Sequence, residues 1–197
     1  LMKIHYLERL GVNALWLNPI FLSPSNHKYD TQDYHEIDPH VGTEQELIEL
    51  VKALHEKDIR IVLDGVFNHT GSCHAWFNRD GFYKIQGAWQ NPSGPYAEYY
   101  VQYRLKEFHY WAGYSTLPTL NYQSPKLRDE IYRKENSVAQ KYVRPPFSTD
   151  GWRLDVAETL GRQDKIQVHH EVWPEFRKAV KQANSEAYIM GECGTDA

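Results

Sequence analysis

The chain has 197 residues, enough for one domain with a sizeable core, and its 41% hydrophobic and 24% charged residues are typical of a soluble globular protein. A net charge of −4 argues against binding to nucleic acid, and no apolar run reaches the roughly 18–20 residues of a membrane span. The two cysteines, Cys73 and Cys193, lie far apart and form no CxxC pattern, so the sequence favours a reducing compartment and predicts a cytoplasmic location.

The chain begins with a predicted helix, strand and loop. Residues 2–10 carry apolar side chains at helical spacing and predict a helix that ends at Gly11. Residues 12–19 are an apolar run closed by a proline and predict a buried strand. Residues 20–42 are rich in Ser, Asn, Asp and Pro and predict a loop.

A capping box opens the next predicted helix. Thr43 is followed three residues later by Glu46, and the helix is predicted to continue through about Lys57. Residues 59–64 form a second apolar run, which predicts another buried strand. Strand, helix and strand in this order are typical of a βαβ unit, whose two strands are parallel.

The middle of the chain is irregular and aromatic. Residues 70–121 show no period, and 13 of the 27 aromatic residues of the chain lie between Trp76 and Tyr114. This segment predicts an inserted subdomain. Its aromatic side chains would form the subdomain core, stack on sugar rings in a pocket, or do both.

The last third of the chain returns to alternating helices and strands. The sequence predicts a helix over 125–142, a strand over 150–156, a helix over 174–183 and a strand over 187–192. It places the His169–His170 pair on a solvated loop.

Three of the predicted strands end in an acidic residue: Asp64, Asp155 and Glu192. Chemistry in parallel barrels takes place at the C-terminal ends of the strands, and a buried carboxylate costs free energy unless it is paired or functional. These acids therefore predict a shared site. A metal site is the alternative, because His69 follows Asp64, but no HxH or HExxH partner exists and no metal is predicted.

Two of these acids are expected to lie in contrasting environments. Arg153 and Asp155 point to the same side of a strand, so the guanidinium should lower the pKa of Asp155 and suit it to be a nucleophile. Glu192 follows an apolar run, and burial there would suit it to be a general acid. Such a pair is typical of glycosidic cleavage, and a retaining mechanism needs the two roughly 5–5.5 Å apart.

Five segments resemble conserved regions of the α-amylase superfamily, glycoside hydrolase family 13. Residues 64–69 (DGVFNH), 151–155 (GWRLD) and 191–192 (GE) resemble its first, second and third regions. Residues 117–121 (LPTLN) resemble the signature before the fourth barrel strand, and residues 28–34 (KYDTQDY) extend the likeness to essentially the whole chain. The order and spacing of these strings make the match specific, and it is closest to bacterial maltodextrin glucosidases in the neopullulanase-like branch.

The resemblance implies an α/β fold, a partial (β/α)8 TIM barrel with about strands two to five. Residues 1–69 would form the first part of the barrel, 70–121 an inserted domain B after the third strand, and 122–197 the second part. The family's fourth region, which carries a third catalytic aspartate, does not occur before Ala197. The open strand edges of a partial barrel predict that these residues alone are poorly stable or inactive.

The resemblance also implies the catalytic roles. Asp155 would be the nucleophile that forms a glycosyl-enzyme, Glu192 would act first as acid and then as base, and Arg153 would orient Asp155.

Further roles concern substrate binding and cofactors. Tyr29 would stack under the glucose at the cleaved position, Asp64 and His69 would bind its hydroxyls or support the site, and Asn68 would brace the loop. Thr119 stands where other branches carry Asp or Lys, so calcium there is not supported and no cofactor is predicted.

The resemblance predicts a retaining hydrolase that releases glucose from maltodextrins. These α-1,4-glucans are the predicted binding partner. A neopullulanase, a cyclomaltodextrinase or a transglycosylase is the enzymatic alternative. Acceptor preference stays open because Cys193 follows Glu192 where many relatives carry an aromatic residue, and Glu158 stands where amylases often carry Lys. A non-catalytic carbohydrate-binding domain is the second alternative, and a homo-oligomer is left open for the full-length protein.

Overall fold

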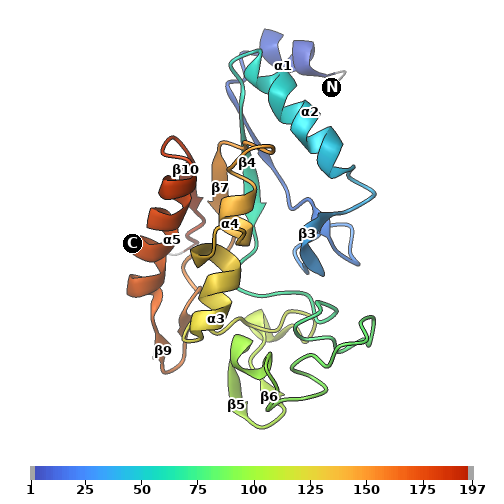
Figure 1. Cartoon of the computed structure of the whole chain (residues 1–197), viewed down its shortest axis with the longest axis vertical. Helices are drawn as coiled ribbons and strands as arrows, with labels where there is room; N and C mark the ends of the chain where they lie inside the picture. Colours follow the sequence, from blue (N-terminus) through green and yellow to red (C-terminus); the bar gives the residue numbers. More distant parts are fainter. Residues whose placement is uncertain (1–2, 195–197) are drawn as a thin grey trace.

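A four-stranded parallel sheet organises the chain in the computed structural model, which describes residues 3–194 (Figure 1). Its strands are β1 (Ala14–Leu17), β4 (Arg60–Gly65), β7 (Gly151–Leu154) and β10 (Tyr188–Gly191), in that spatial order. Each corresponds to a predicted strand, and a parallel sheet of four strands fits part of a TIM barrel.

The register brings the three acidic strand ends to one edge of the sheet. Asp64 on β4 pairs with Arg153 on β7, and Leu154 pairs with Gly191 on β10. Asp155 and Glu192 follow directly after β7 and β10, so they lie at the same edge as Asp64. The acids predicted to share a site are therefore neighbours.

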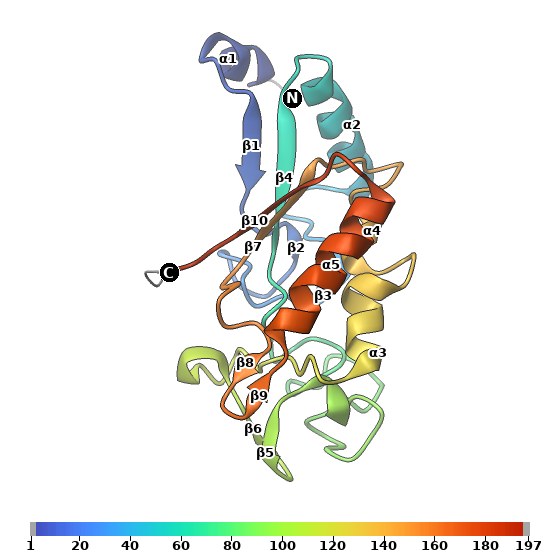
Figure 2. The same cartoon turned by 90° about the vertical axis from the view of Figure 1, so that its left-hand side faces the viewer.

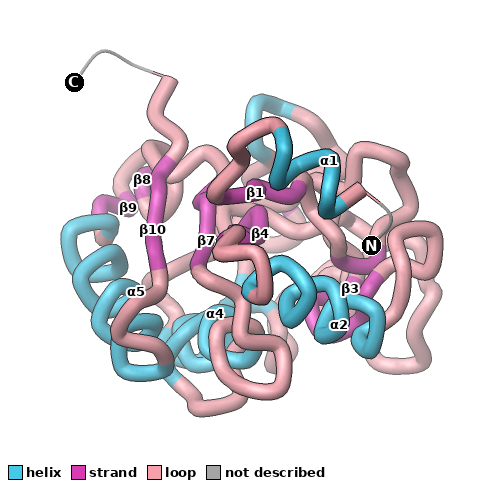
Figure 3. The backbone as a smooth tube through the Cα atoms, turned by 90° about the horizontal axis from the view of Figure 1, so that it is seen from above, coloured by secondary structure: helices cyan, strands magenta, loops and turns pink. Residues whose placement is uncertain are grey.

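Helices cover one face of the sheet. Helices α2 (Glu44–His55), α4 (Val138–Lys141) and α5 (His169–Ala183) follow the curve of the strands in the view from above (Figure 3). The core between the layers is aromatic: Phe67 packs against Trp152 at 5.2 Å between ring centroids and against a phenylalanine of α5 at 5.8 Å. Burial of this face fixes the sheet on which the site is built.

The N-terminal elements agree with the sequence pattern. Helix α1 (Ile4–Arg9) ends before Gly11, whose φ of 77° lies in the left-handed region that glycine adopts most easily. The predicted helix included Met2, which lies outside the described residues. The predicted capping box at α2 is confirmed, since the Thr43 hydroxyl accepts from the backbone of Glu46 and the Glu46 carboxylate accepts from the backbone of Thr43.

The prediction of a loop over residues 20–42 is wrong in part. Two short strands, β2 (Phe21–Leu22) and β3 (Asp33–Ile37), form an antiparallel pair within it. The polar sequence of β3 concealed it, because only Tyr34 and Ile37 of this strand are buried. Its pairing with β2 therefore comes from tertiary packing and not from local pattern.

The predicted helix over 125–142 is broken. It consists of α3 (Pro125–Arg128), a π-helical turn (Asp129–Arg133) and α4, with an extended residue, Lys134, between the turn and α4. The side chain of Gln140 donates to the carbonyls of residues 132 and 133 at 2.7 and 3.3 Å. These bonds satisfy carbonyls that a continuous helix would have used, so the break is stable.

Helix α5 begins earlier than predicted. It starts at His169, so Pro174 lies inside the helix, and the His169–His170 pair occupies the first turn instead of a loop. The ring of Pro174 removes one backbone donor, but it does not stop the helix because the buried face of α5, with Val172 and Phe176, packs on the core.

Residues 70–121 lie beyond the C-terminal ends of the strands (Figures 1 and 2). They contain two single 3-10 turns, Ala97–Tyr99 and Trp111–Gly113, and a short hairpin of β5 (Gln102–Arg104) and β6 (Glu107–Phe108). A second hairpin, of β8 (Arg162–Gln163) and β9 (Ile166–Gln167), follows the third strand of the sheet. That residues 70–121 form a separate inserted domain stays a prediction.

The two outer strands of the sheet carry exposed apolar side chains. Trp16 on β1 is 48% exposed, and Tyr188 and Met190 on β10 are 60% and 37% exposed. Such open edges agree with a sheet that represents only part of a barrel. Within residues 3–194, no helix combines the length and the apolar composition needed to cross a membrane.

Candidate active site

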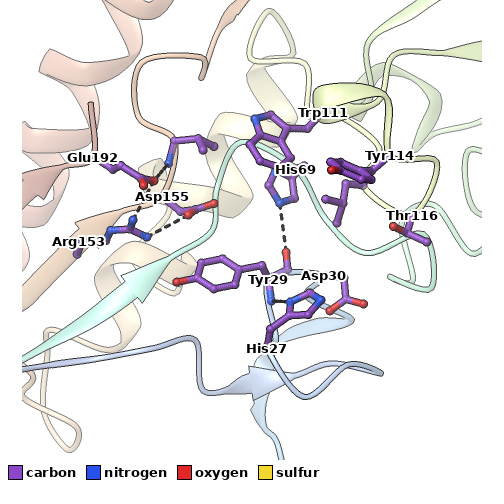
Figure 4. Close-up of a pocket in the computed structure, with 12 residues that line it drawn as sticks. His27, Tyr29, Asp30, His69, Trp111, Tyr114, Thr116, Arg153, Asp155 and Glu192 are labelled. Atoms are coloured by element: carbon purple, nitrogen blue, oxygen red, sulfur yellow. Dashed lines mark hydrogen bonds and ion pairs between the residues drawn. The ribbon is translucent and has the colours of Figure 1, made fainter. Parts of the chain in front are cut away.

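Arg153 lies at the centre of the acidic cluster (Figure 4). Its Nη1 donates to both carboxylate oxygens of Asp64 at 2.9 and 3.0 Å and to Oδ1 of Asp155 at 3.0 Å. Its Nη2 lies 2.8 Å from Oε2 of Glu192. One guanidinium therefore contacts three carboxylates, which lie at or just beyond the C-terminal ends of the neighbouring strands β4, β7 and β10.

Asp64 is the most deeply buried of the three acids, at 1% exposure. Its Oδ2 accepts from the Tyr29 hydroxyl at 3.1 Å and from the indole of Trp16 at 3.2 Å, in addition to Arg153. The guanidinium of Arg153 also lies over the Trp16 ring, 4.7 Å from its centroid. Burial raises the pKa of Asp64, although the hydrogen bonds from Arg153, Tyr29 and Trp16 oppose this.

The pKa of Asp155 contradicts the sequence prediction. Arg153 was expected to lower it, and the ion pair is present, yet the pKa is raised to about 7. Burial is the main cause, since Asp155 is 7% exposed, and the negative charge of Asp64 is the next. The sequence argument failed because it counted one carboxylate beside Arg153, whereas three share it.

The surroundings of Glu192 also differ from the prediction. The apolar run before it suggested burial, but its side chain is 42% exposed and lies in an ion pair with Arg153. Its Oε2 also accepts the backbone N–H of Val156 at 2.8 Å. The apolar residues of β10 precede Glu192 on the strand and do not enclose its carboxylate.

A cavity of about 560 Å³ opens beside the cluster. Asp155, Arg153 and Glu192 form one wall, Tyr29 lies beside Asp155, and His69 lies farther along the cavity (Figure 4). The remaining lining residues come from the loops around the sheet: His27, Asp30, Trp111, Tyr114, Thr116, Leu117 and Val156. A cavity of this size with aromatic walls and convergent polar groups can hold a small ligand such as a few sugar units.

His69 connects the end of β4 to the Tyr29 loop. It is 1% exposed, and burial lowers its pKa to about 4, so it is neutral. Its Nε2 donates to the backbone oxygen of Tyr29 at 3.2 Å, and its Nδ1 can then accept from Asn68 at 3.3 Å. Asn68 is buried behind the cavity, where its Oδ1 lies 3.2 Å from the hydroxyl of Thr159.

The structure thus places five of the seven predicted site residues in the cavity lining. Asp64 is bonded to two of these, Tyr29 and Arg153, and Asn68 lies behind the cavity. Sequence reasoning missed Trp16, Trp111 and Tyr114. The aromatic run over residues 70–121 pointed to sugar-stacking side chains but could not single out Trp111 and Tyr114, whose rings are stacked at 6.1 Å. Trp16 gave no signal, since its strand looked uniformly apolar.

Thr119 is completely buried, and its hydroxyl lies 2.8 Å from Nδ1 of His109. Among the residues that the structure describes, no three His, Cys, Asp or Glu side chains are grouped so that they could hold a metal ion. That Thr119 does not support a calcium site stays a prediction from the sequence.

Comparison with known proteins identifies clear relatives. Residues 1–197 match the family model "Alpha amylase, catalytic domain". The chain is 41% identical over 204 residues to a cyclomaltodextrinase of Geobacillus thermopakistaniensis, covering 98% of this chain and 31% of the relative. It is 38% identical over 211 residues to an amylopullulanase of Thermoanaerobacterium thermosulfurigenes, covering 99% of this chain and 11% of the relative.

Solved structures agree with this match. A cyclomaltodextrinase structure superposes with a TM-score of 0.82 at 34% identity and covers 97% of this chain and 31% of its own. A debranching enzyme of Nostoc punctiforme superposes with a TM-score of 0.81 at 33% identity. The match covers 100% of this chain and 40% of the debranching enzyme. The chain therefore spans well under half the length of the proteins that it matches.

Proposed function

Because the chain belongs to the alpha-amylase family, glycoside hydrolase family 13, we propose that it carries the two catalytic carboxylates of a retaining enzyme that cleaves α-glucans. The observation that supports this most directly is the Arg153 cluster. Asp155 and Glu192 are both within 3.0 Å of one guanidinium, at the open wall of a cavity with aromatic sides. A retaining mechanism needs the two carboxyl groups roughly 5–5.5 Å apart, and their shared contact with one guanidinium supports a close pair.

The proposed reaction has two steps. A carboxylate oxygen of Asp155 attacks the anomeric carbon, the glycosidic C–O bond breaks, and the proton of Glu192 passes to the leaving oxygen. The Glu192 carboxylate then takes a proton from water, whose oxygen attacks the anomeric carbon and releases Asp155. Arg153 holds the two side chains in place during both steps.

This cycle needs Asp155 ionised and Glu192 protonated at its start. In the structure the raised pKa belongs to Asp155, and Glu192 is half-exposed. We propose that a bound glycan, with further residues of a longer protein, covers the exposed side of Glu192. Burial disfavours a charged carboxylate, so such covering would move the proton from Asp155 to Glu192.

The other site residues are proposed to hold the sugar and the loop that binds it. Tyr29 lines the cavity beside Asp155 and would stack under the glucose ring at the cleaved bond. Asp64 already accepts from three side chains, and both ring nitrogens of His69 have partners. These contacts favour a supporting role for Asp64 and His69 over the direct binding of sugar hydroxyls.

The names of the relatives favour one substrate class over another. Glucose release from maltodextrins is the first candidate from sequence. Three of the relatives are cyclomaltodextrinases at 36–41% identity, and two Bacillus subtilis proteins at 37% are named intracellular maltogenic amylase. Three further relatives at 34–38% identity are amylopullulanases. We therefore propose a cyclomaltodextrinase or neopullulanase type of activity, with glucose release as the second candidate. A cytoplasmic location stays a prediction.

Product analysis tests the proposal with the protein at its natural length. Maltotriose and β-cyclodextrin are supplied separately, and Asp155→Asn serves as the control because amide and carboxylate have nearly the same volume. Faster opening of the cyclodextrin supports the cyclomaltodextrinase type, and glucose from maltotriose alone supports the second candidate. Asp155→Asn should lose about 10⁴-fold or more of the rate. Tight binding of both sugars without turnover would contradict an enzymatic role and favour a carbohydrate-binding domain.

A further inference from the structure

The turn that follows β7 contacts Glu192 directly. Val156, the residue after Asp155, donates its backbone N–H to Oε2 of Glu192 at 2.8 Å. Its φ of 39° is left-handed, a strained conformation for a β-branched residue. Such a conformation persists only where surrounding contacts hold it, so the contacts of this turn indicate what it does.

One set of contacts anchors the turn to the buried side of the site. The backbone N–H of Thr159 donates to the Val156 oxygen at 3.0 Å. The Thr159 hydroxyl lies 3.1 Å from the same oxygen and 3.2 Å from Oδ1 of Asn68. Asn68 is 1% exposed at the end of β4 and also accepts from Gln163 at 3.3 Å. The turn is therefore fixed to the sheet on its inner side.

A second set of contacts reaches the chain beyond Glu192. Oε2 of Glu158 accepts the backbone N–H of Gly194 at 3.0 Å and lies 3.5 Å from the sulfur of Cys193. Strand β10 ends at Gly191, and the Glu192 N–H, which donates to the Leu154 oxygen at 2.9 Å, extends the ladder by one bond into this segment. Glu158 is half-buried and is not among the cavity-lining residues. Its contacts therefore serve the chain and not the ligand.

We infer that the turn 156–159 positions the carboxylate of Glu192, and that Glu158 is a positioning residue within this turn. Val156 fixes the carboxylate from its side, and Glu158 fixes the backbone that follows it. This inference rests on the proposed role of Glu192 as acid and base. Arg153 holds the Glu192 carboxylate on one side, but this side chain is half-exposed at a strand end, so the turn adds further points of attachment. Such attachment matters because a misplacement of about 1 Å can cost roughly 10²-fold in rate.

The test compares two leaving groups in the full-length protein. An α-glucan oxygen leaves only when Glu192 protonates it, whereas the fluoride of α-maltosyl fluoride leaves as an anion with little help from an acid. Glu158→Ala should lower kcat/KM for maltotriose by about 10- to 100-fold but lower it for α-maltosyl fluoride by less than about 3-fold. Glu158→Gln should restore kcat/KM to within about 5-fold of the parent protein, because its amide oxygen still accepts the Gly194 N–H.

Three reference variants make the outcomes distinct. Glu192→Gln should show the same split between substrates at larger size, and without that split the proposed acid role fails. If Glu192→Gln shows the split, but Glu158→Ala lowers kcat/KM equally for both substrates or for neither, the positioning role of the turn is overturned and the acid role of Glu192 stands. Thr159→Val, which keeps the shape of the side chain, should show a smaller split and replaces Glu158→Ala if that variant unfolds. Glu107→Ala, an exposed acid on β6, should leave both substrates unchanged.

Discussion

Two buried ion clusters of this chain have opposite effects on their carboxylates. In the loop that carries Tyr29, Asp38 is 1% exposed and lies 2.6 Å from the ammonium of Lys28. Burial alone would raise its pKa, but Lys28, the backbone N–H and ring of His40, and the N–H of Ser23 lower it to about 2. In the active site, Asp155 is 7% exposed and lies 3.0 Å from Arg153, yet its pKa rises to about 7.

Burial raises the pKa of both carboxylates, and the two differ in the charges and donors that surround them. Lys28 faces one carboxylate, and three further donors complete that pair. Arg153 faces three carboxylates, so the cluster holds more negative than positive charge and retains a proton near neutral pH. The surroundings of Asp38 thus favour an ionised carboxylate, whereas the cluster around Arg153 favours a protonated one near neutral pH, as expected of the proposed catalytic site.

Among the changes that separate the two clusters, replacing the shared cation should have the largest effect. Arg153→Lys keeps the charge, but one ammonium cannot reach the three carboxylates that the planar guanidinium joins. We expect kcat/KM for the preferred glucan to fall by about 10²-fold or more. Arg60→Lys is the matched control, because Arg60 pairs with Asp150 at the other end of β4 and is 67% exposed. A wild-type rate in Arg153→Lys would show that the shared guanidinium is not required.

The loop cluster should matter for stability and not for chemistry. Lys28→Met leaves Asp38 buried without its cation, and breaking a buried pair costs about 3–5 kcal/mol in the free energy of unfolding. Lys57→Met is the control, since its pair with Glu8 is 33% and 43% exposed and such a surface pair contributes little to stability. Urea unfolding of both variants measures the two costs. Equal costs would mean that the Lys28–Asp38 pair stabilises no more than a surface pair.

Much of the site could be predicted from sequence because it follows from strand ends. Apolar runs that stop at Asp64, Asp155 and Glu192 located β4, β7 and β10 within one or two residues, and parallel pairing brings such ends together. The pKa of Asp155 could not be predicted. It depends on the pairing of Asp64 with Arg153 across strands 89 residues apart, which no local pattern reveals.

The fold elements that sequence missed also depend on distant contacts. The break before α4 is stabilised by Gln140, whose side chain reaches back to carbonyls seven and eight residues earlier. The early start of α5 depends on Val172, which is buried in the core. Exposure of Glu192 likewise reflects what lies around it in space, whereas the apolar run before it reports only its neighbours in the chain.

The smallest expected effect is a shift in pH dependence, and its sign differs between the two clusters. The pKa of Asp155 is raised from its ordinary 3.8 to about 7, so the folded chain holds a proton that the unfolded chain releases. Between about pH 4 and pH 7 this group makes the free energy of unfolding fall as pH rises. The pKa of Asp38 is lowered to about 2, so its contribution is present above about pH 4 and is lost as pH falls towards 2.

The substitution Asp64→Asn separates these two effects. The negative charge of Asp64 raises the pKa of Asp155, so its removal should lower that pKa and leave the acid-side loss of stability at Asp38 unchanged. The acid limb of kcat/KM, which reports ionisation of the nucleophile in the free enzyme, should move to lower pH. Asp80→Asn, outside the cavity lining, should leave the limb in place. A limb that stays fixed or moves to higher pH in Asp64→Asn would show that crowding of carboxylates around Arg153 does not set the proton affinity of Asp155.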